Sequence, residues 1–121
     1  MSQLCYNSRD ELVVIDLDKV AYIQAGGNYS LVVYITGQKT TITAGISKIE
    51  MMVAKSYERG KSSPFVRLGR SLIINQQYLR RINVLKQSIM LTDLEHQPLV
   101  LPVPKSLIRN FKEYVENKYK K

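Results

Sequence analysis

The sequence predicts a mainly β protein with one or two helices, and two observations support that prediction. Short apolar, β-branched or aromatic runs, separated by turn residues, fill most of residues 12–101, as is typical of strands. Apolar residues at helical spacing occur in two segments, residues 46–57 and 104–118. The 121 residues are 45% hydrophobic and 23% charged, which indicates one folded domain rather than a disordered chain.

The first half of the chain reads as four strands, of which the last two form a hairpin. Strands are expected at residues 12–15, 20–24, 29–35 and 39–43. Gly26-Gly27-Asn28 is a strong turn signal, because Gly and Asn tolerate positive φ, and we expect Asn28 itself in the left-handed region. Residues 1–9 precede this pattern and are expected to be mobile.

A change of period marks each helix. Ile46, Ile49, Met52 and Val53 share one helical face, which predicts an amphipathic helix over residues 46–57 that ends before the breaker at residues 60–64. Further strands are expected at residues 65–68, 72–74, 79–85, 88–92 and 99–101. The last helix should begin at Pro104, whose missing N–H costs nothing in a first turn.

The charge of the chain points to an anionic partner. The net charge is +8 and the pI is about 9.7, which favours nucleic acid first and an anionic membrane surface second. No segment approaches the roughly 18 apolar residues of a spanning helix, and the N-terminus does not resemble a signal peptide. The single cysteine, Cys5, suits a reducing compartment, so we expect a cytoplasmic protein without a membrane partner.

Catalytic and metal-binding signals are weak. The one histidine, His96, lies in a predicted loop beside two acids, and a metal site needs more converging ligands than this. Cys5 has no histidine near it in sequence to act as its base. Gly26-Gly27 matches no phosphate-loop motif. We therefore expect no enzyme activity, no metal and no cofactor.

The segment of residues 65–75 is the most informative stretch. Arg67, Gly69, Arg70 and Ser71 interrupt apolar strand residues with groups that suit phosphate oxygens or the acceptor edge of guanine. Residues 59–92 contain seven Lys or Arg and no Asp or Glu, so local carboxylate partners for these arginines are not expected. Two further polar clusters, Asn28-Tyr29-Ser30 and Lys105-Ser106, predict one anion-binding surface if the fold brings all three together.

Three motifs in order resemble those of LytTR-type DNA-binding domains, over roughly residues 10–118. Residues 20–29, VAYIQAGGNY, resemble the family signature Y-I-E-A-x-G-N-Y. Residues 65–75, FVRLGRSLIIN, look like F-x-R-x-H-R-S-x-[IL]-V-N, and residues 101–105, LPVPK, are similar to L-P-V-S-R. The chain departs from the family at Gln24, Gly69 and Pro104, where glutamate, histidine and serine are usual.

The resemblance implies packed antiparallel sheets whose loops and strand ends enter major grooves of double-stranded DNA. It also implies a single domain over residues 1–121, a transcription regulator that binds promoter direct repeats, a receiver domain or sensor partner, and a dimer on DNA. The contact candidates that it gives are Asn28, Tyr29, Ser30, Arg67, Gly69, Arg70, Ser71, Pro104, Lys105 and Ser106. The three departures affect the expected sequence preference more than binding itself.

Two other classes of binding protein remain open at this point. A small basic β domain can bind RNA or single strands by stacking bases on tyrosines, for which Tyr29 and Tyr34 are the candidates. A basic face can also serve an adaptor that binds an acidic protein or a membrane.

Overall fold

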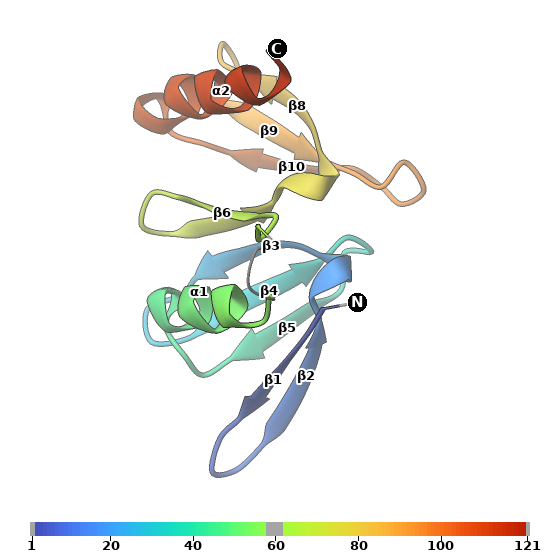
Figure 1. Ribbon diagram of the computed structural model, residues 1–121, viewed down its shortest axis with the longest axis vertical. Coiled ribbons are helices and arrows are strands. Elements are labelled where there is room, and N and C mark those ends of the chain that lie inside the picture. Colours follow the sequence, from blue (N-terminus) through green and yellow to red (C-terminus); the bar gives the residue numbers. More distant parts are fainter. Residues whose placement is uncertain (1, 58–61, 121) are drawn as a thin grey trace.

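The computed structural model describes residues 2–57 and 62–120 and is drawn in Figure 1. Its strands are β1 (Gln3–Asn7), β2 (Leu12–Asp16), β3 (Val20–Ala25), β4 (Ser30–Tyr34), β5 (Lys39–Ile42), β6 (Phe65–Leu68), β7 (Leu72–Asn75), β8 (Leu79–Asn83), β9 (Ser88–Leu91) and β10 (Leu99–Pro102). Two α-helices, α1 (Ile46–Lys55) and α2 (Lys105–Tyr119), and two short 3-10 helices, η1 (Leu17–Lys19) and η2 (Gln76–Tyr78), complete it. The predicted mainly β class is confirmed.

The strands form three antiparallel sheets. The central sheet has five strands in the order β5-β4-β3-β7-β6, so the chain returns to pair β7 with β3 after α1. The order of the second sheet is β10-β9-β8, and β1 pairs with β2 in a separate hairpin. Figure 1 shows the central sheet between that hairpin and the second sheet, which α2 covers.

Each face of the central sheet is covered by its own hydrophobic core. Ile23 and Ile73 point into the first core, where they pack with Ile49 of α1 and with the hairpin. Ile74 points the other way, into the second core, which includes Phe111 of α2. Successive strand residues alternate faces, so the apolar run of β7 fills both cores at once. Continuous apolar strands are typical of a sheet covered on both sides.

The N-terminal segment corrects one prediction. Residues 3–7, expected to be mobile, form β1 and pair with β2 along their whole length. Leu4 and Tyr6 are buried at alternate positions, and the Tyr6 hydroxyl donates a hydrogen bond to the Thr43 carbonyl oxygen at 3.0 Å. The period-two burial of these two side chains is what orders the segment.

Most predicted element bounds agree with the structure within one or two residues. Helix α1 ends at Lys55, not at Tyr57, and Ser56 is its C-cap. Residues 60 and 61 of the predicted breaker lie outside the described residues. No helix among residues 2–57 and 62–120 is long and apolar enough to cross a membrane.

Asn75 fixes the junction between β7 and η2. Its side-chain amide is fully buried and donates to the Val20 carbonyl oxygen at 2.9 Å, while its Oδ1 accepts the Gln77 backbone N–H at 3.0 Å. A buried amide without such partners would destabilise the core. The asparagine therefore joins β3, β7 and η2, and it fixes the point after β7 where the chain leaves the central sheet and continues into β8 of the second sheet.

Candidate nucleic acid interface

One edge of the molecule brings the three predicted clusters together. In Figure 1 the β3–β4 turn, the β6–β7 turn and the first turn of α2 all lie along the left edge. The Ala25 N–H donates to the Ser71 carbonyl oxygen at 2.8 Å, which links the first two turns. Leu107 lies against Gly69, which links the second turn to α2. We call this the turn edge and define it by residues 26–29, 69–71 and 104–106.

Asn28 is exposed to solvent on the β3–β4 turn. The Gly26 N–H donates to the Tyr29 carbonyl oxygen at 2.9 Å, and Gly27 adopts the left-handed backbone with φ of +83°. Gly26 leaves room for the Tyr29 ring, since a Cβ there would lie 2.3 Å from it and the ring would have to move. The prediction of a left-handed Asn28 is wrong, since Gly27 takes that conformation. The exposed Asn28 amide makes no hydrogen bond to the residues that the structure describes.

Ser30 lies beneath the turn rather than on its surface. Its side chain is fully buried, and its hydroxyl donates to the Ala44 carbonyl oxygen at 2.7 Å. This bond ties the start of β4 to the segment that leads into α1. The hydroxyl is therefore occupied, and Ser30 supports the turn without presenting a donor to a ligand.

Arg67 holds the β6–β7 turn in shape. Its Nε donates to the Gly69 carbonyl oxygen at 3.0 Å, and its Nη2 donates to the Arg70 carbonyl oxygen at 3.1 Å. Its Nη1 forms an ion pair with Glu50 at 2.7 Å and donates to the Ser47 hydroxyl at 3.3 Å. Residues 59–92 contain no local carboxylate for this arginine, but Glu50 of α1 supplies one from a distant part of the sequence, so Arg67 is not left unpaired.

Arg70 is the second arginine of this turn and differs from Arg67 in its contacts. Gly69, Arg70 and Ser71 form a three-residue loop between the paired Leu68 and Leu72. All three loop residues are exposed. Within residues 2–57 and 62–120, the Arg70 guanidinium makes no ion pair and donates no hydrogen bond. An unpaired guanidinium on an ordered turn is available to an anionic partner.

Both α-helices begin at the turn edge with open N-termini. Pro104 is the N-cap of α2, so the helix begins one residue later than predicted, at Lys105, and no side chain caps it. Helix α1 follows Gly45 and also lacks a side-chain cap among the described residues. Gly45 lies beside the β3–β4 turn. A Cβ built on Gly45 would be 3.6 Å from the Gly27 carbonyl oxygen. Free N–H groups at helix N-termini favour anions.

Lys48 was missed by the sequence reasoning. It is exposed in the first turn of α1, which lies next to the turn edge. Lys48 is therefore a third cation in this region, besides Arg70 and Lys105. In the sequence, Gly45 directly precedes an amphipathic helix, which marks a helix N-terminus near Lys48. Nothing in the sequence placed that N-terminus beside the Gly26-Gly27-Asn28 turn. Lys105 and Ser106 are both exposed, as predicted for surface groups at the start of α2.

The positive charge is unevenly distributed along the chain. Residues 62–121 contain eleven Lys or Arg and four Asp or Glu, whereas residues 1–61 contain seven and six. The excess therefore belongs to the half of the chain that supplies Arg70 and Lys105 to the turn edge.

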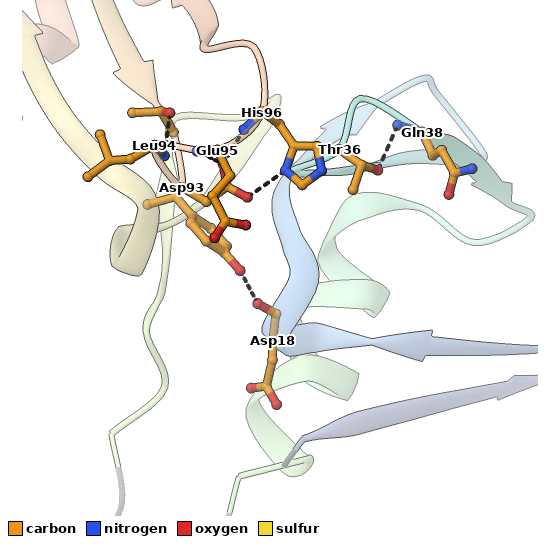
Figure 2. Close-up of polar contacts among 9 residues, drawn as sticks. Asp18, Thr36, Gln38, Asp93, Leu94, Glu95 and His96 are labelled. Carbon is orange, nitrogen blue, oxygen red and sulfur yellow. Dashed lines mark hydrogen bonds and ion pairs between the residues drawn. The ribbon is translucent and has the colours of Figure 1, made fainter.

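The opposite edge of the molecule carries the candidate metal ligands. Ligand atoms of Asp93, Glu95 and His96 lie within 4.8 Å of one another, and Figure 2 shows the Asp93 carboxylate against the His96 ring. That carboxylate accepts the backbone N–H of His96 at 2.8 Å and of Glu95 at 2.9 Å, and it contacts His96 Nδ1 at 2.7 Å. These bonds hold the pKa of Asp93 well below its usual range. The carboxylate therefore serves to close its own loop.

The two candidate stacking tyrosines lie at opposite ends of β4. Tyr29 is 43% exposed at the turn edge. Tyr34 is half-buried at the other end, where it lines a different hollow together with Asp16 and His96. Five strand residues span roughly 17 Å, so the two rings do not form one continuous platform.

These features define a class of protein. A small basic domain that presents turns, an unpaired arginine and two helix N-termini along one edge has the surface of a nucleic-acid-binding module. The family model of the LytTr DNA-binding domain matches residues 10–116. The chain belongs to the LytTR family of DNA-binding domains, which is not a family of enzymes.

A solved structure supports the fold. The chain is similar to the LytTr DNA-binding domain of a protein from Bacillus cereus described as a methyl-accepting/DNA response regulator, with a TM-score of 0.61. The two share 18% sequence identity, and the match covers 95% of this chain and 97% of the other. No curated protein matches the chain. The predicted packed antiparallel sheets with a C-terminal helix are thereby confirmed.

Proposed function

We propose that this domain binds double-stranded DNA sequence-specifically and serves as the output domain of a transcription regulator. The observation that supports this best is the convergence of three separate polar segments on one basic edge. Turns on a rigid sheet can enter a major groove, whose base edges carry a distinct donor and acceptor code. The family motifs fall on these same turns.

The residues of the turn edge divide into two proposed roles. Arg70 and Asn28 are exposed and have no side-chain partner among residues 2–57 and 62–120, so they are the candidates for reading base edges, since Arg suits guanine and Asn suits adenine. Lys48, Lys105 and the open helix N-termini neutralise phosphates and set the register on the duplex. Arg67 and Ser30 act as positioning residues.

A selection experiment tests the proposal and identifies the target sequence. Genomic fragments retained by the domain are sequenced, and fluorescence anisotropy then compares the selected duplex, a shuffled duplex and each single strand. Specific duplex binding gives the selected duplex the lowest Kd at fixed salt. Tighter binding of single strands would instead favour the stacking function, and indifference to all DNA at low salt would favour an adaptor.

The selected sites also test the proposed arrangement on DNA. Promoter direct repeats would appear as two copies of one motif in the same orientation, and a dimer on DNA would bind both cooperatively. A receiver domain or a sensor protein is the proposed source of control over this output domain.

Salt dependence should reveal the phosphate contribution. If about five phosphates are contacted, the logarithm of the binding constant should fall against the logarithm of salt concentration with a slope of roughly −4 to −5. Anisotropy titrations from low to physiological salt measure that slope. A slope near zero would contradict a phosphate-dominated interface.

Asn28→Ala should weaken discrimination without harming the fold. Because Asn28 is not left-handed and its amide has no partner in the described part of the chain, alanine removes a recognition group and little else. We expect the preference for the selected duplex over a shuffled one to shrink by about 1–3 kcal/mol. Asn110→Ala, an exposed asparagine on α2, is the matched control and should change nothing. Unchanged discrimination by Asn28→Ala would show that Asn28 is only a turn residue.

A further inference from the structure

The two ends of the molecule differ in charge. At one end, a groove of about 470 Å³ lies between the start of β8 and the C-terminal half of α2. We call it the basic groove, because its lining includes four cations and one acid, namely Arg80, Arg81, Lys112, Lys118 and Glu116. Residues 2–18, which include the β1–β2 hairpin, contain four Asp or Glu and one Arg. Figure 1 shows α2 and this hairpin at opposite ends of the long axis, with the turn edge along one side between them.

A β-bulge exposes two consecutive arginines at the basic groove. The pairing of β8 with β9 shifts register between Leu79 and Arg81, so Arg80 is the extra residue of the bulge. Neighbouring side chains of a regular strand alternate between its faces, yet Arg80 and Arg81 are both exposed. Arg80 donates to two backbone carbonyl oxygens, whereas Arg81 makes no side-chain hydrogen bond or ion pair within residues 2–57 and 62–120. Arg81 is therefore available to a carboxylate of a partner.

The one acid of the basic groove does not cancel its charge. The Glu116 carboxylate lies 3.5 Å from the Lys112 ammonium and 3.5 Å from the Lys120 ammonium. Lys112 and Lys120 hold the pKa of Glu116 below its ordinary value, so this carboxyl stays ionised and is shared by two cations. A net positive charge remains for a partner to neutralise.

The floor of the basic groove is apolar. It is formed by the half-buried side chains of Leu79, Ile82 and Val115, and Tyr119 lies at its end with 83% of its surface exposed. Phosphate groups would pair with the arginines but leave this floor uncovered. A protein segment that carries carboxylates beside an apolar side chain satisfies both parts, and Arg and Tyr are residue types enriched at protein–protein interfaces.

The tip of the β1–β2 hairpin, residues 8–12, has that composition. Asp10 and Glu11 are exposed, and the adjacent Leu12 is 59% exposed. The Ser8 N–H donates to the Glu11 carbonyl oxygen at 2.8 Å, and the Ser8 hydroxyl accepts the Glu11 N–H at 3.3 Å. These bonds order the tip through the backbone of Glu11, whose carboxylate has no partner in the described part of the chain.

We infer that the hairpin tip of one copy of this domain docks in the basic groove of the next copy on DNA. The inference rests on the proposed function, because direct repeats hold neighbouring copies in the same orientation. Copies in one orientation meet through two different surfaces, which is a heterologous contact. The hairpin tip and the basic groove are two such surfaces, of opposite charge and at opposite ends of the molecule. Carboxylates of the tip pair with Arg81 and its neighbours, and Leu12 covers the apolar floor.

The contact can be weak and still matter on DNA. A shared duplex holds neighbouring copies at an effective concentration on the order of 1 mM. An end-to-end Kd of roughly 0.1 mM then raises the affinity of the second copy about tenfold over that for an isolated site. Free in solution at millimolar concentration, the same contact should build chains longer than a dimer, because a heterologous contact leaves one unused surface at each end.

Two charge-reversed variants of the full chain test the contact. Arg81→Glu alters the basic groove, and Glu11→Lys alters the hairpin tip. Anisotropy titrations on duplexes with one selected site, or with two in direct orientation, give the cooperativity as the affinity for the second site relative to that for a single site. Each single variant should lose the roughly tenfold cooperativity of the wild type. The double variant Arg81→Glu/Glu11→Lys should regain it, since opposite charges meet again. Cooperativity that the double variant does not regain would contradict the contact.

Lys39→Glu is the matched control for Arg81→Glu. Lys39 is exposed at the start of β5, belongs to neither surface, and its reversal changes the net charge by the same amount. It should lower the affinity for one site and for two sites alike and leave cooperativity unchanged. A loss of single-site affinity for Arg81→Glu far beyond that for Lys39→Glu, with cooperativity intact, would show that the groove binds phosphates and would overturn the inference.

Sedimentation of the free protein separates this inference from the proposed function. Physiological salt screens the repulsion between chains of net charge +8. At millimolar concentration the wild type should then reach a weight-average mass above that of a dimer, and an equal mixture of the two single variants should associate more than either alone. If chains form but no duplex binds, the end-to-end contact stands and the DNA proposal is wrong. If duplex binds but the free protein stays monomeric and fills two sites independently, the contact is wrong and the DNA proposal stands.

Discussion

An Arg70→Ala variant is expected to lose about 1–3 kcal/mol of binding free energy for the selected duplex, a roughly 5- to 150-fold rise in Kd. The guanidinium is exposed on an ordered three-residue turn and has no partner among the described residues, so alanine removes a DNA contact and no folding contact. Anisotropy measures the affinity, and calorimetry should find the thermal midpoint nearly unchanged.

Arg67→Ala is the matched control, because the two arginines differ in their protein contacts. Arg67 bonds to two backbone carbonyl oxygens and to Glu50. Its loss should reduce the free energy of unfolding by about 1–2 kcal/mol, a modest value because the pair is partly exposed. A large drop in the thermal midpoint for Arg70→Ala instead would show that Arg70 is structural, and its site assignment would fail.

Gly69→Ala is expected to be the most destabilising of the substitutions considered, at about 1–3 kcal/mol of unfolding free energy. Two effects add: φ is +70°, where an L side chain is strained, and the new Cβ would lie 2.8 Å from Leu107 Cδ1. Because Leu107 packs at the start of α2, its displacement should also move Lys105 and weaken duplex binding. Urea unfolding and anisotropy measure the two losses.

Gly27→Ala isolates the backbone part of that effect. Gly27 also has positive φ, at +83°, but no atom lies within 4 Å of its would-be Cβ. It should therefore show the backbone cost alone and be the milder variant. The stability loss of the double variant Gly69→Ala/Leu107→Ala should be smaller than the sum of the two single losses, because the new Cβ and the Leu107 side chain would be in contact. Equal losses for the two glycine variants would contradict the proposed role of Leu107.

The fold could be predicted largely because its local signals agree with its tertiary packing. Most strands carry β-branched runs bounded by turn residues, and each helix has one apolar face. Strand β1 is the exception, because a five-residue terminal segment carries little local signal. Its order comes from pairing with β2 and from burial of Leu4 and Tyr6, which are tertiary effects.

The candidate site was harder to predict because its residues differ by contacts that are distant in sequence. Arg67 and Arg70 are three residues apart and look alike in sequence. In the described residues, however, Glu50 forms an ion pair with Arg67 and not with Arg70. Ser30 is next to Tyr29 but is buried, and its hydroxyl donates to the Ala44 carbonyl oxygen, fourteen residues away. The conformation of the β3–β4 turn depends on which of Gly26, Gly27 and Asn28 adopts positive φ. Local propensity does not decide between Gly27 and Asn28, because both residue types tolerate that conformation.

The single cysteine offers a way to measure how the domain is arranged on DNA. Cys5 is exposed on the β1–β2 hairpin and does not belong to the turn edge. A fluorophore attached there would leave the proposed DNA contacts untouched. Two copies on direct repeats one helical turn apart would place equivalent atoms about 34 Å from each other on straight DNA, wherever they lie in the domain. Energy transfer between two labelled copies would therefore report the distance set by the repeat spacing. A distance that differs from the value for straight DNA would report the curvature of the bound duplex.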